Sequence, residues 1–133
     1  MNPDQELKLE KKVLYVEDDT VNCLVMKGLL QRYSINVEIA TTAHEAVLKA
    51  KRFLFPLILM DINLGEEETD GILLSRELRA LPGYEACPIF AITAYPELHL
   101  TMGEERGIFQ RYFYKPFNRD ELAQAILGEL SPS

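Results

Sequence analysis

Short runs of apolar residues alternate along this chain with longer segments in which apolar residues repeat every three or four positions. The short runs are rich in Val, Ile, Tyr and Phe, which favour β-strands. They predict five strands, at 13–16, 37–40, 57–60, 89–92 and 112–114. The first, third and fourth runs are apolar at every position, which indicates strands that are buried on both faces.

Each predicted strand is followed by a segment that predicts a helix. The helix signals are Thr20 as an N-cap, the capping box Thr42–Glu45, the pair Asp70-Gly71 before a helix, Pro96 in the first turn of a helix over 96–105, and the capping signature Asn118–Glu121. In the first helix the apolar repeat is Val21, Leu24, Val25, Gly28 and Leu29. A strand–helix unit repeated five times predicts one doubly wound α/β domain, with a parallel sheet covered by helices on both faces.

Composition narrows the classes of function. The 133 residues suit one domain, and we expect a lead-in over 1–10, the domain over 11–130 and a tail over 131–133. Against 21 Asp and Glu stand 14 Lys and Arg, and this net charge of −7 argues against direct binding of nucleic acid. No apolar run is long enough for membrane insertion and the first residues lack a signal-peptide core, so we expect a cytoplasmic protein. Cys23 and Cys87 form neither a zinc spacing nor a disulfide framework.

Polar residues capable of site chemistry follow four of the five predicted strands. They are Glu17, Asp18 and Asp19 after the first strand, Asp61 after the third, Thr93 (followed by Ala94) after the fourth, and Lys115 after the fifth. The carboxyl ends of parallel strands meet at one edge of a sheet, so these side chains are expected to converge. Neighbouring carboxylates repel unless a cation compensates, and ligation by oxygen alone suits Mg²⁺.

The same set of groups suits a phosphoryl group. A lysine, a divalent cation and a hydroxyl can together compensate the charge on its three oxygens. An aspartate can itself be the nucleophile and form an aspartyl phosphate. The chemistry alone therefore predicts a Mg²⁺-dependent site in which one carboxylate accepts a phosphoryl group.

Four segments of the chain resemble the receiver domain of two-component response regulators. They are Leu14–Asp19, Leu59–Leu64, Ile92–Ala94 and Tyr112–Phe117, in the family's order, and the resemblance covers about residues 11–130. It implies a flavodoxin-like, five-stranded sheet of order 2-1-3-4-5 with five helices. It also implies that Asp61 takes a phosphoryl group from a histidine kinase or a histidine phosphotransfer protein.

The resemblance also implies a role for each residue of the site. Glu17, Asp18, Asp61 and the backbone carbonyl of Asn63 would hold Mg²⁺ (or Mn²⁺). Thr93, Ala94 and Lys115 would bind the phosphoryl group, and Tyr112 would turn inward in the active state. Phosphorylation would then switch a surface around the fourth helix, fifth strand and fifth helix that binds a downstream protein target.

Two features depart from the commonest family pattern. Glu17 stands where many receivers have aspartate, and Glu17-Asp18 with Asn22 resembles the receivers of hybrid histidine kinases, which makes a phosphorelay component plausible. Gly71 lies 10 residues after Asp61 (71 − 61), so the loop between them is longer than usual. This loop carries Glu66–Glu68, which we expect to be a solvated charged face or a determinant of partner choice.

Other functions stay open at this point. A degenerate receiver would bind partners without phosphorylation, and Val16–Val21 superficially resembles the Asp-x-Asp motif of phosphatases that use an aspartyl-phosphate intermediate. We expect no enzyme activity beyond self-phosphotransfer and autodephosphorylation, although a parent protein could be a hybrid histidine kinase. Asp19 is expected to be a solvated or capping residue, and Tyr95 to lie at the rim of the site. His44 and His99 lie on predicted helices and are not expected to be catalytic.

Overall fold

The computed structural model of this chain describes residues 12–62, 68–95 and 107–131, and the side chains of residues 68–70 are outside that description. The strands are β1 (Lys12–Val16), β2 (Asn36–Ala40), β3 (Ile58–Ile62), β4 (Ile89–Thr93) and β5 (Arg111–Tyr114). The described helices are α2 (Thr20–Gln31), α3 (Ala43–Arg52), α4 (Glu68–Arg79) and α6 (Arg119–Leu130). The strands form one parallel sheet of order β2-β1-β3-β4-β5, which confirms the predicted class and strand order. The helix predicted at 96–105 lies outside the described residues.

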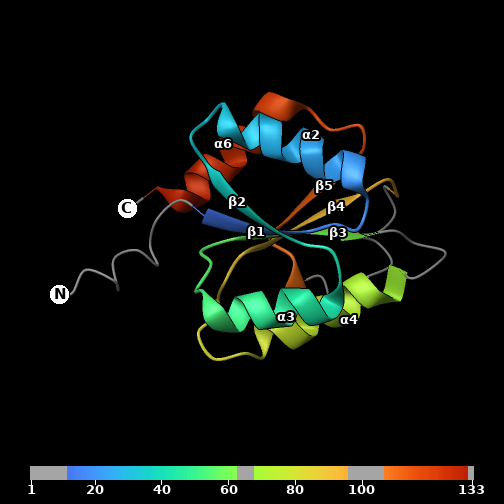
Figure 1. Ribbon diagram of the computed structural model, residues 1–133, viewed down its shortest axis with the longest axis vertical. Coiled ribbons are helices and arrows are strands. Elements are labelled where there is room, and N and C mark those ends of the chain that lie inside the picture. The colour runs from blue at the N-terminus through green and yellow to red at the C-terminus, as the bar shows by residue number, and fades with distance from the viewer. Residues whose placement is uncertain (1–11, 63–67, 96–106, 132–133) are drawn as a thin grey trace.

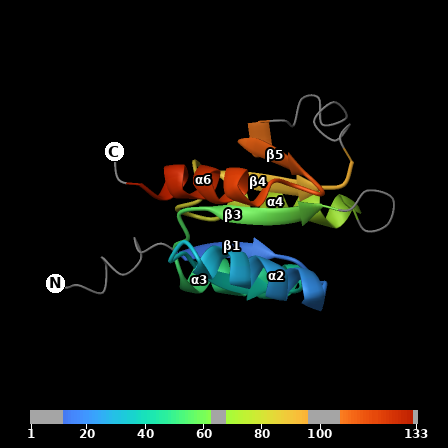
Figure 2. The ribbon, with the colours of Figure 1, turned by 90° about the horizontal axis from the view of Figure 1, so that it is seen from above.

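Helices cover both faces of the sheet. Figure 1 shows α2 and α6 on one face and α3 and α4 on the other, and Figure 2 shows the same layers from above. Successive strand residues point to opposite faces, so Leu14 and Val16 pack on the α3–α4 side while Val13 and Tyr15 pack on the α2–α6 side. This burial on both faces explains the continuously apolar runs in the sequence. In the part of the chain that is described, no helix has the length and apolarity needed to cross a membrane.

The three predicted N-terminal caps have different outcomes. The Oδ1 atom of Asp19 accepts a hydrogen bond from the Asn22 N–H at 2.9 Å, so Asp19 caps α2 and the prediction of Thr20 was wrong by one residue. Aspartate and threonine are both good caps, and here they are adjacent. The caps at Thr42 and Asn118 are confirmed, since each side chain accepts the N–H three residues later.

The helix α2 is apolar on more than one side. Its buried residues are Cys23, Met26, Leu29 and Leu30. Val21 and Leu24 are 66% and 65% exposed, and Val25 is also exposed. The apolar repeat thus predicted the helix correctly, but most of that repeat faces away from the core. We call the exposed side chains of Val21, Leu24 and Val25 the α2 stripe.

The start of α4 corrects another prediction. Asp70-Gly71 was expected to precede this helix, but α4 begins at Glu68 and therefore contains both residues. A Cβ atom on Gly71 would lie 3.2 Å from Cγ1 of Ile62 and 3.4 Å from the carbonyl oxygen of Asp61. Glycine at this position therefore allows close approach between the first turn of α4 and the end of β3. Residues 63–67, which include Glu66 and Glu67, lie outside the described residues.

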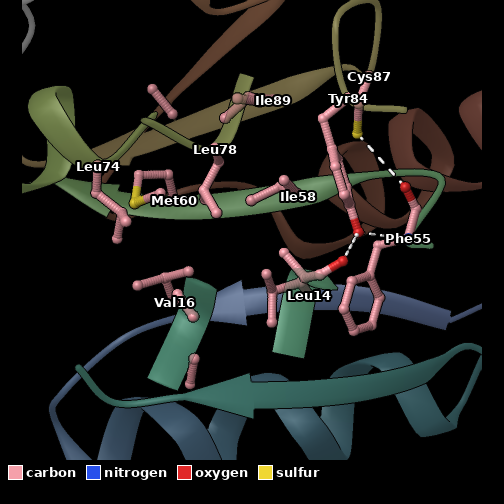
Figure 3. Close-up of a cluster of buried hydrophobic side chains, with 14 of the residues drawn as sticks. Leu14, Val16, Phe55, Ile58, Met60, Leu74, Leu78, Tyr84, Cys87 and Ile89 are labelled. Atoms are coloured by element: carbon pink, nitrogen blue, oxygen red, sulfur yellow. Dashed lines mark hydrogen bonds between the residues drawn. The ribbon is translucent and has the colours of Figure 1, made fainter. Parts of the chain in front are cut away.

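A buried tyrosine ties the opposite end of the sheet together. The Tyr84 hydroxyl lies 2.8 Å from the carbonyl oxygen of Ala50 and 2.6 Å from that of Phe53, and it accepts a hydrogen bond from the Phe55 N–H at 3.1 Å. Figure 3 shows Tyr84 reaching from its loop to Phe55 within the core. Because β3 starts shortly after Phe55, this contact helps to fix the position of β3.

Replacing Tyr84 with phenylalanine is expected to lower the free energy of unfolding by about 2–3 kcal/mol, because buried backbone groups lose their partner. Urea denaturation measures the change. Tyr33→Phe is the matched control, since the Tyr33 hydroxyl bonds an exposed carboxylate at 2.6 Å. An equal loss of stability in both variants would contradict this interpretation.

Candidate functional site

Four predicted site residues meet at the carboxyl edge of the sheet. Glu17 directly follows β1, Asp61 lies in β3, Thr93 ends β4 and Lys115 directly follows β5. Asp61 is paired in register with Ile92 of β4, so it belongs to the strand and does not follow it as predicted. Since β1, β3, β4 and β5 are successive neighbours in the sheet, all four side chains are brought to one edge.

Asp61 is buried and has one cationic partner. Its side chain is 3% exposed, and the Lys115 ammonium lies 2.6 Å from Oδ2. The Lys115 N–H donates to the carbonyl oxygen of Thr93 at 2.8 Å, which holds the lysine against β4. The other oxygen, Oδ1, is buried and has no hydrogen-bond partner among the described residues. Asp61 thus keeps one oxygen available for a cation or an electrophile.

Glu17 is the second buried carboxylate, at 4% exposure. Its Oε1 accepts hydrogen bonds from the Tyr15 hydroxyl at 3.1 Å and from Nδ2 of Asn22 at 3.2 Å. Its Oε2 accepts the Asp19 N–H at 3.1 Å. Burial, and then the neighbouring Asp61 carboxylate, raise the pKa of Glu17 above its ordinary value, although the Asp19 N–H and Lys115 oppose this. The Asp61 carboxylate is therefore close enough to disfavour the charged form of Glu17, which a cation would relieve.

The remaining predicted residues occupy different positions around this centre. Asp18 and Ala94 are exposed. Thr93 is fully buried, and its Oγ1 accepts the N–H of Tyr95, whose side chain is partly exposed. Tyr112 is half-buried, with its ring edge-to-face against Phe109 at 5.7 Å between centroids.

The remaining candidates are the two histidines and Asn63. His44 is exposed on α3, while Asn63 and His99 lie outside the described residues.

The donors at this edge fit a hard cation that keeps its own waters. Among the described residues, no three His, Cys, Asp or Glu side chains form a group that could hold a metal ion by themselves. Mg²⁺ does not need such a group, because it binds one or two carboxylates and completes its shell with water or carbonyl oxygens. The unpartnered Oδ1 of Asp61 and the raised pKa of Glu17 beside the Asp61 carboxylate fit this kind of ligation.

Sequence reasoning missed the groups that hold Glu17. Tyr15 was read only as part of an apolar strand, and Asn22 only as part of a resemblance. The signal for Tyr15 was available, since residues two apart on a strand share a face and Glu17 is the second residue after it. Cys23 also contributes, because its Sγ lies 3.3 Å from the carbonyl oxygen of Glu17. Both cysteines are free, in agreement with the absence of a disulfide framework in the sequence, and both are buried.

Comparison with known proteins gives relatives in two-component signalling. The transcriptional regulatory protein ZraR of Salmonella typhimurium is 29% identical over 114 residues, which are 86% of this chain and 25% of ZraR. The signal transduction histidine-protein kinase BarA of Escherichia coli is 31% identical over 126 residues, which are 92% of this chain and 13% of BarA. The chain therefore spans a quarter or less of the length of these curated relatives.

A solved structure shares both fold and sequence with this chain. It is the receiver domain of the sensor histidine kinase PA1611 from Pseudomonas aeruginosa, with a magnesium ion coordinated in its active site cleft. The TM-score is 0.75 at 31% identity, covering 90% of this chain and 97% of that one. The sequence model of the response regulator receiver domain matches residues 13–127. This chain therefore belongs to the response regulator receiver domain family of two-component signalling.

Proposed function

We propose that Asp61 accepts a phosphoryl group from a phosphohistidine donor, either a histidine kinase or a histidine phosphotransfer protein. The observation that carries this proposal is the asymmetry of the Asp61 carboxylate. Oδ2 forms an ion pair with Lys115 at 2.6 Å, whereas Oδ1 has no such partner, and neither buried oxygen accepts a hydrogen bond from the described residues. A phosphorus atom arriving at this edge would meet Oδ1 as the available nucleophile.

The transfer step uses groups already at this edge. Oδ1 of Asp61 forms a bond to phosphorus as the bond from phosphorus to the donor imidazole breaks, and the imidazole nitrogen keeps the electron pair and is protonated from solvent. Lys115 compensates negative charge on the phosphoryl oxygens. The Thr93 hydroxyl accepts the Tyr95 N–H, so its own proton is free to donate to a phosphoryl oxygen.

We propose Mg²⁺ as the cation of this site, held by the carboxylates of Glu17, Asp18 and Asp61 and by the carbonyl of Asn63. When bound, it would compensate charge on the phosphoryl oxygens as they approach the carboxylates. Mn²⁺ prefers similar oxygen ligands, so it is a plausible substitute. The magnesium in the PA1611 receiver domain supports this assignment.

Intact mass spectrometry tests the proposed function. The chain is incubated with acetyl phosphate and MgCl₂, with an EDTA sample in parallel. We expect one phosphoryl adduct that fragmentation locates on Asp61 and that EDTA prevents. Absence of any adduct, with acetyl phosphate and with phosphohistidine donors alike, would overturn the proposal in favour of a degenerate receiver. Catalytic turnover of an external phosphoester would instead favour the alternative function, a phosphatase that uses an aspartyl-phosphate intermediate.

We propose the α2 stripe as the surface that meets the donor protein. α2 begins directly after the Glu17–Asp19 loop, so Val21 and Leu24 lie beside the site on an exposed helix face. A histidine that reaches a buried Asp61 must come from a partner that covers this rim. Apolar side chains exposed as a group commonly mark such interfaces.

Leu24→Glu is expected to slow phosphoryl transfer from a phosphohistidine donor by about tenfold or more, because the new charge must be desolvated in the interface. The rate with acetyl phosphate should not change. Leu73→Glu is the matched control, since Leu73 is exposed to a similar degree, at 54%, on α4 on the other face of the sheet. If both variants slow the transfer equally, the α2 stripe is not the surface of this chain that contacts the donor protein.

The output is proposed to be a change in protein binding. The surface around β5, α6 and Tyr112 would bind a downstream protein target once Asp61 is phosphorylated, by a shift between two existing conformations. We propose a cytoplasmic location, no nucleic-acid contact by this domain, and no enzyme activity beyond self-phosphotransfer and autodephosphorylation.

A further inference from the structure

One oxygen of Glu17 is fully occupied by protein donors. A carboxylate has about four acceptor positions, two on each oxygen. Both positions of Oε1 are taken, by the Tyr15 hydroxyl and by Nδ2 of Asn22. Oε2 accepts only the Asp19 N–H among the described residues. Glu17 is thus presented with one closed oxygen and one that still has room for a ligand.

Both donors to Oε1 are held in place by their own surroundings. The Tyr15 ring is buried in the cluster between the sheet and the helices α2 and α6, where it packs with Met26 and Leu29. Asn22 lies in the first turn of α2, and its N–H is fixed by the Asp19 cap. The backbone of Glu17 is also tied, because its N–H donates to the Ala40 carbonyl oxygen at 2.9 Å. The carboxylate therefore cannot rotate without breaking several contacts.

We infer that Tyr15 and Asn22 are positioning residues that make Glu17 a one-oxygen ligand and so favour Mg²⁺ over Ca²⁺. This inference rests on the proposed function, because it concerns the cation of that same site. Mg²⁺ demands octahedral geometry with single oxygen contacts or water, whereas Ca²⁺ accepts bidentate carboxylates and irregular shells. Closing Oε1 removes the bidentate mode of Glu17 and leaves Oε2 to contact the cation or one of its waters.

Calorimetric titration of the metal-free chain with MgCl₂ and with CaCl₂ tests the inference. Tyr15→Phe is expected to raise the Kd for Mg²⁺ about tenfold, the usual effect of losing a group that orients a metal ligand. The Kd for Ca²⁺ should change by about threefold or less, because the freed Oε1 compensates. The preference for Mg²⁺ over Ca²⁺ therefore falls. Asn22→Ala should change it in the same direction, which keeps the test available if one variant folds poorly.

The controls separate positioning from a merely structural role. Tyr33→Phe also removes a tyrosine hydroxyl from a carboxylate, that of Asp120, and should leave both Kd values unchanged. In a Glu17→Gln background, Tyr15→Phe should cause no further loss of Mg²⁺ affinity, because it acts through Glu17. If the wild type binds Mg²⁺ but Tyr15→Phe keeps the wild-type preference, this inference alone is overturned. If the wild type binds neither ion, the proposed metal site is overturned with it.

Discussion

Asp61→Asn is expected to abolish the phosphoryl adduct completely. Asparagine has nearly the same shape as aspartate, but its amide oxygen is a poor nucleophile and cannot form an acyl phosphate. The substitution also removes the charge that Lys115 faces at 2.6 Å. Intact mass after incubation with acetyl phosphate and Mg²⁺ measures the result, and the folded state can be checked by the melting temperature of the same sample.

The matched control is Asp120→Asn, which neutralises an exposed carboxylate that bonds the Tyr33 hydroxyl. This variant should gain the adduct as the wild type does. An adduct that persists in Asp61→Asn would place the phosphoryl group on another side chain, and Asp18 would be the first to examine because it is exposed at the same edge. That outcome would disprove the assignment of Asp61.

The fold was predictable because burial and backbone pattern agree along most of the chain. The strands β3 and β4 begin with residues that are all apolar and buried, Ile58–Met60 and Ile89–Ile92, so these runs are unambiguous. Thr42 and Asn118 mark helix starts because few side chains can accept the first free N–H groups of a helix. These are local constraints, which a sequence displays directly.

Two element boundaries were predicted wrongly, each at a residue whose type is also common outside strands and helices. Asp61 was read as the first residue beyond a strand because it is polar, but it pairs with Ile92 inside the sheet while its side chain forms the site. Gly71 was expected to precede a helix, but it is a helical residue that allows close packing against Ile62. Whether Asp61 belongs to the strand and Gly71 to the helix depends on contacts between elements, and a local sequence pattern does not contain those contacts.

The residues proposed for the site were named from the sequence, but their pairing could not be. The sheet order places Glu17, Asp61, Thr93 and Lys115 at one edge, and this follows from the alternation of strands and helices. Which oxygen of Asp61 faces Lys115, and that Tyr15 bonds Glu17, depend on side-chain rotamers set by the packed core. For that reason the proposals for Oδ1 of Asp61 as nucleophile and for Glu17 as a one-oxygen ligand needed the three-dimensional structure.

The Lys115 ammonium has two consequences that can be measured separately. It is the positive charge placed against the buried Asp61 carboxylate, and Asp61 in turn neighbours the buried Glu17. In the metal-free chain it therefore offsets charge repulsion at this edge. In the proposed transfer reaction it is the protein group that would compensate negative charge on the phosphoryl oxygens. A divalent cation can replace the first contribution more readily than the second, because the second depends on a fixed side-chain geometry.

Lys115→Ala is therefore expected to slow adduct formation at Asp61 by about 10²–10³-fold, the usual effect of losing one preorganised electrostatic contact. In EDTA the variant should also lose about 2 kcal/mol of unfolding free energy, because a buried carboxylate loses its charged partner. Added Mg²⁺ should restore much of the stability but little of the rate. Lys49→Ala is the control, since Lys49 pairs with Glu38 and Glu45 at 3.0 and 3.3 Å away from the site. It should cost about 1 kcal/mol or less and leave the rate unchanged, whereas a wild-type rate in Lys115→Ala would remove Lys115 from the proposed mechanism.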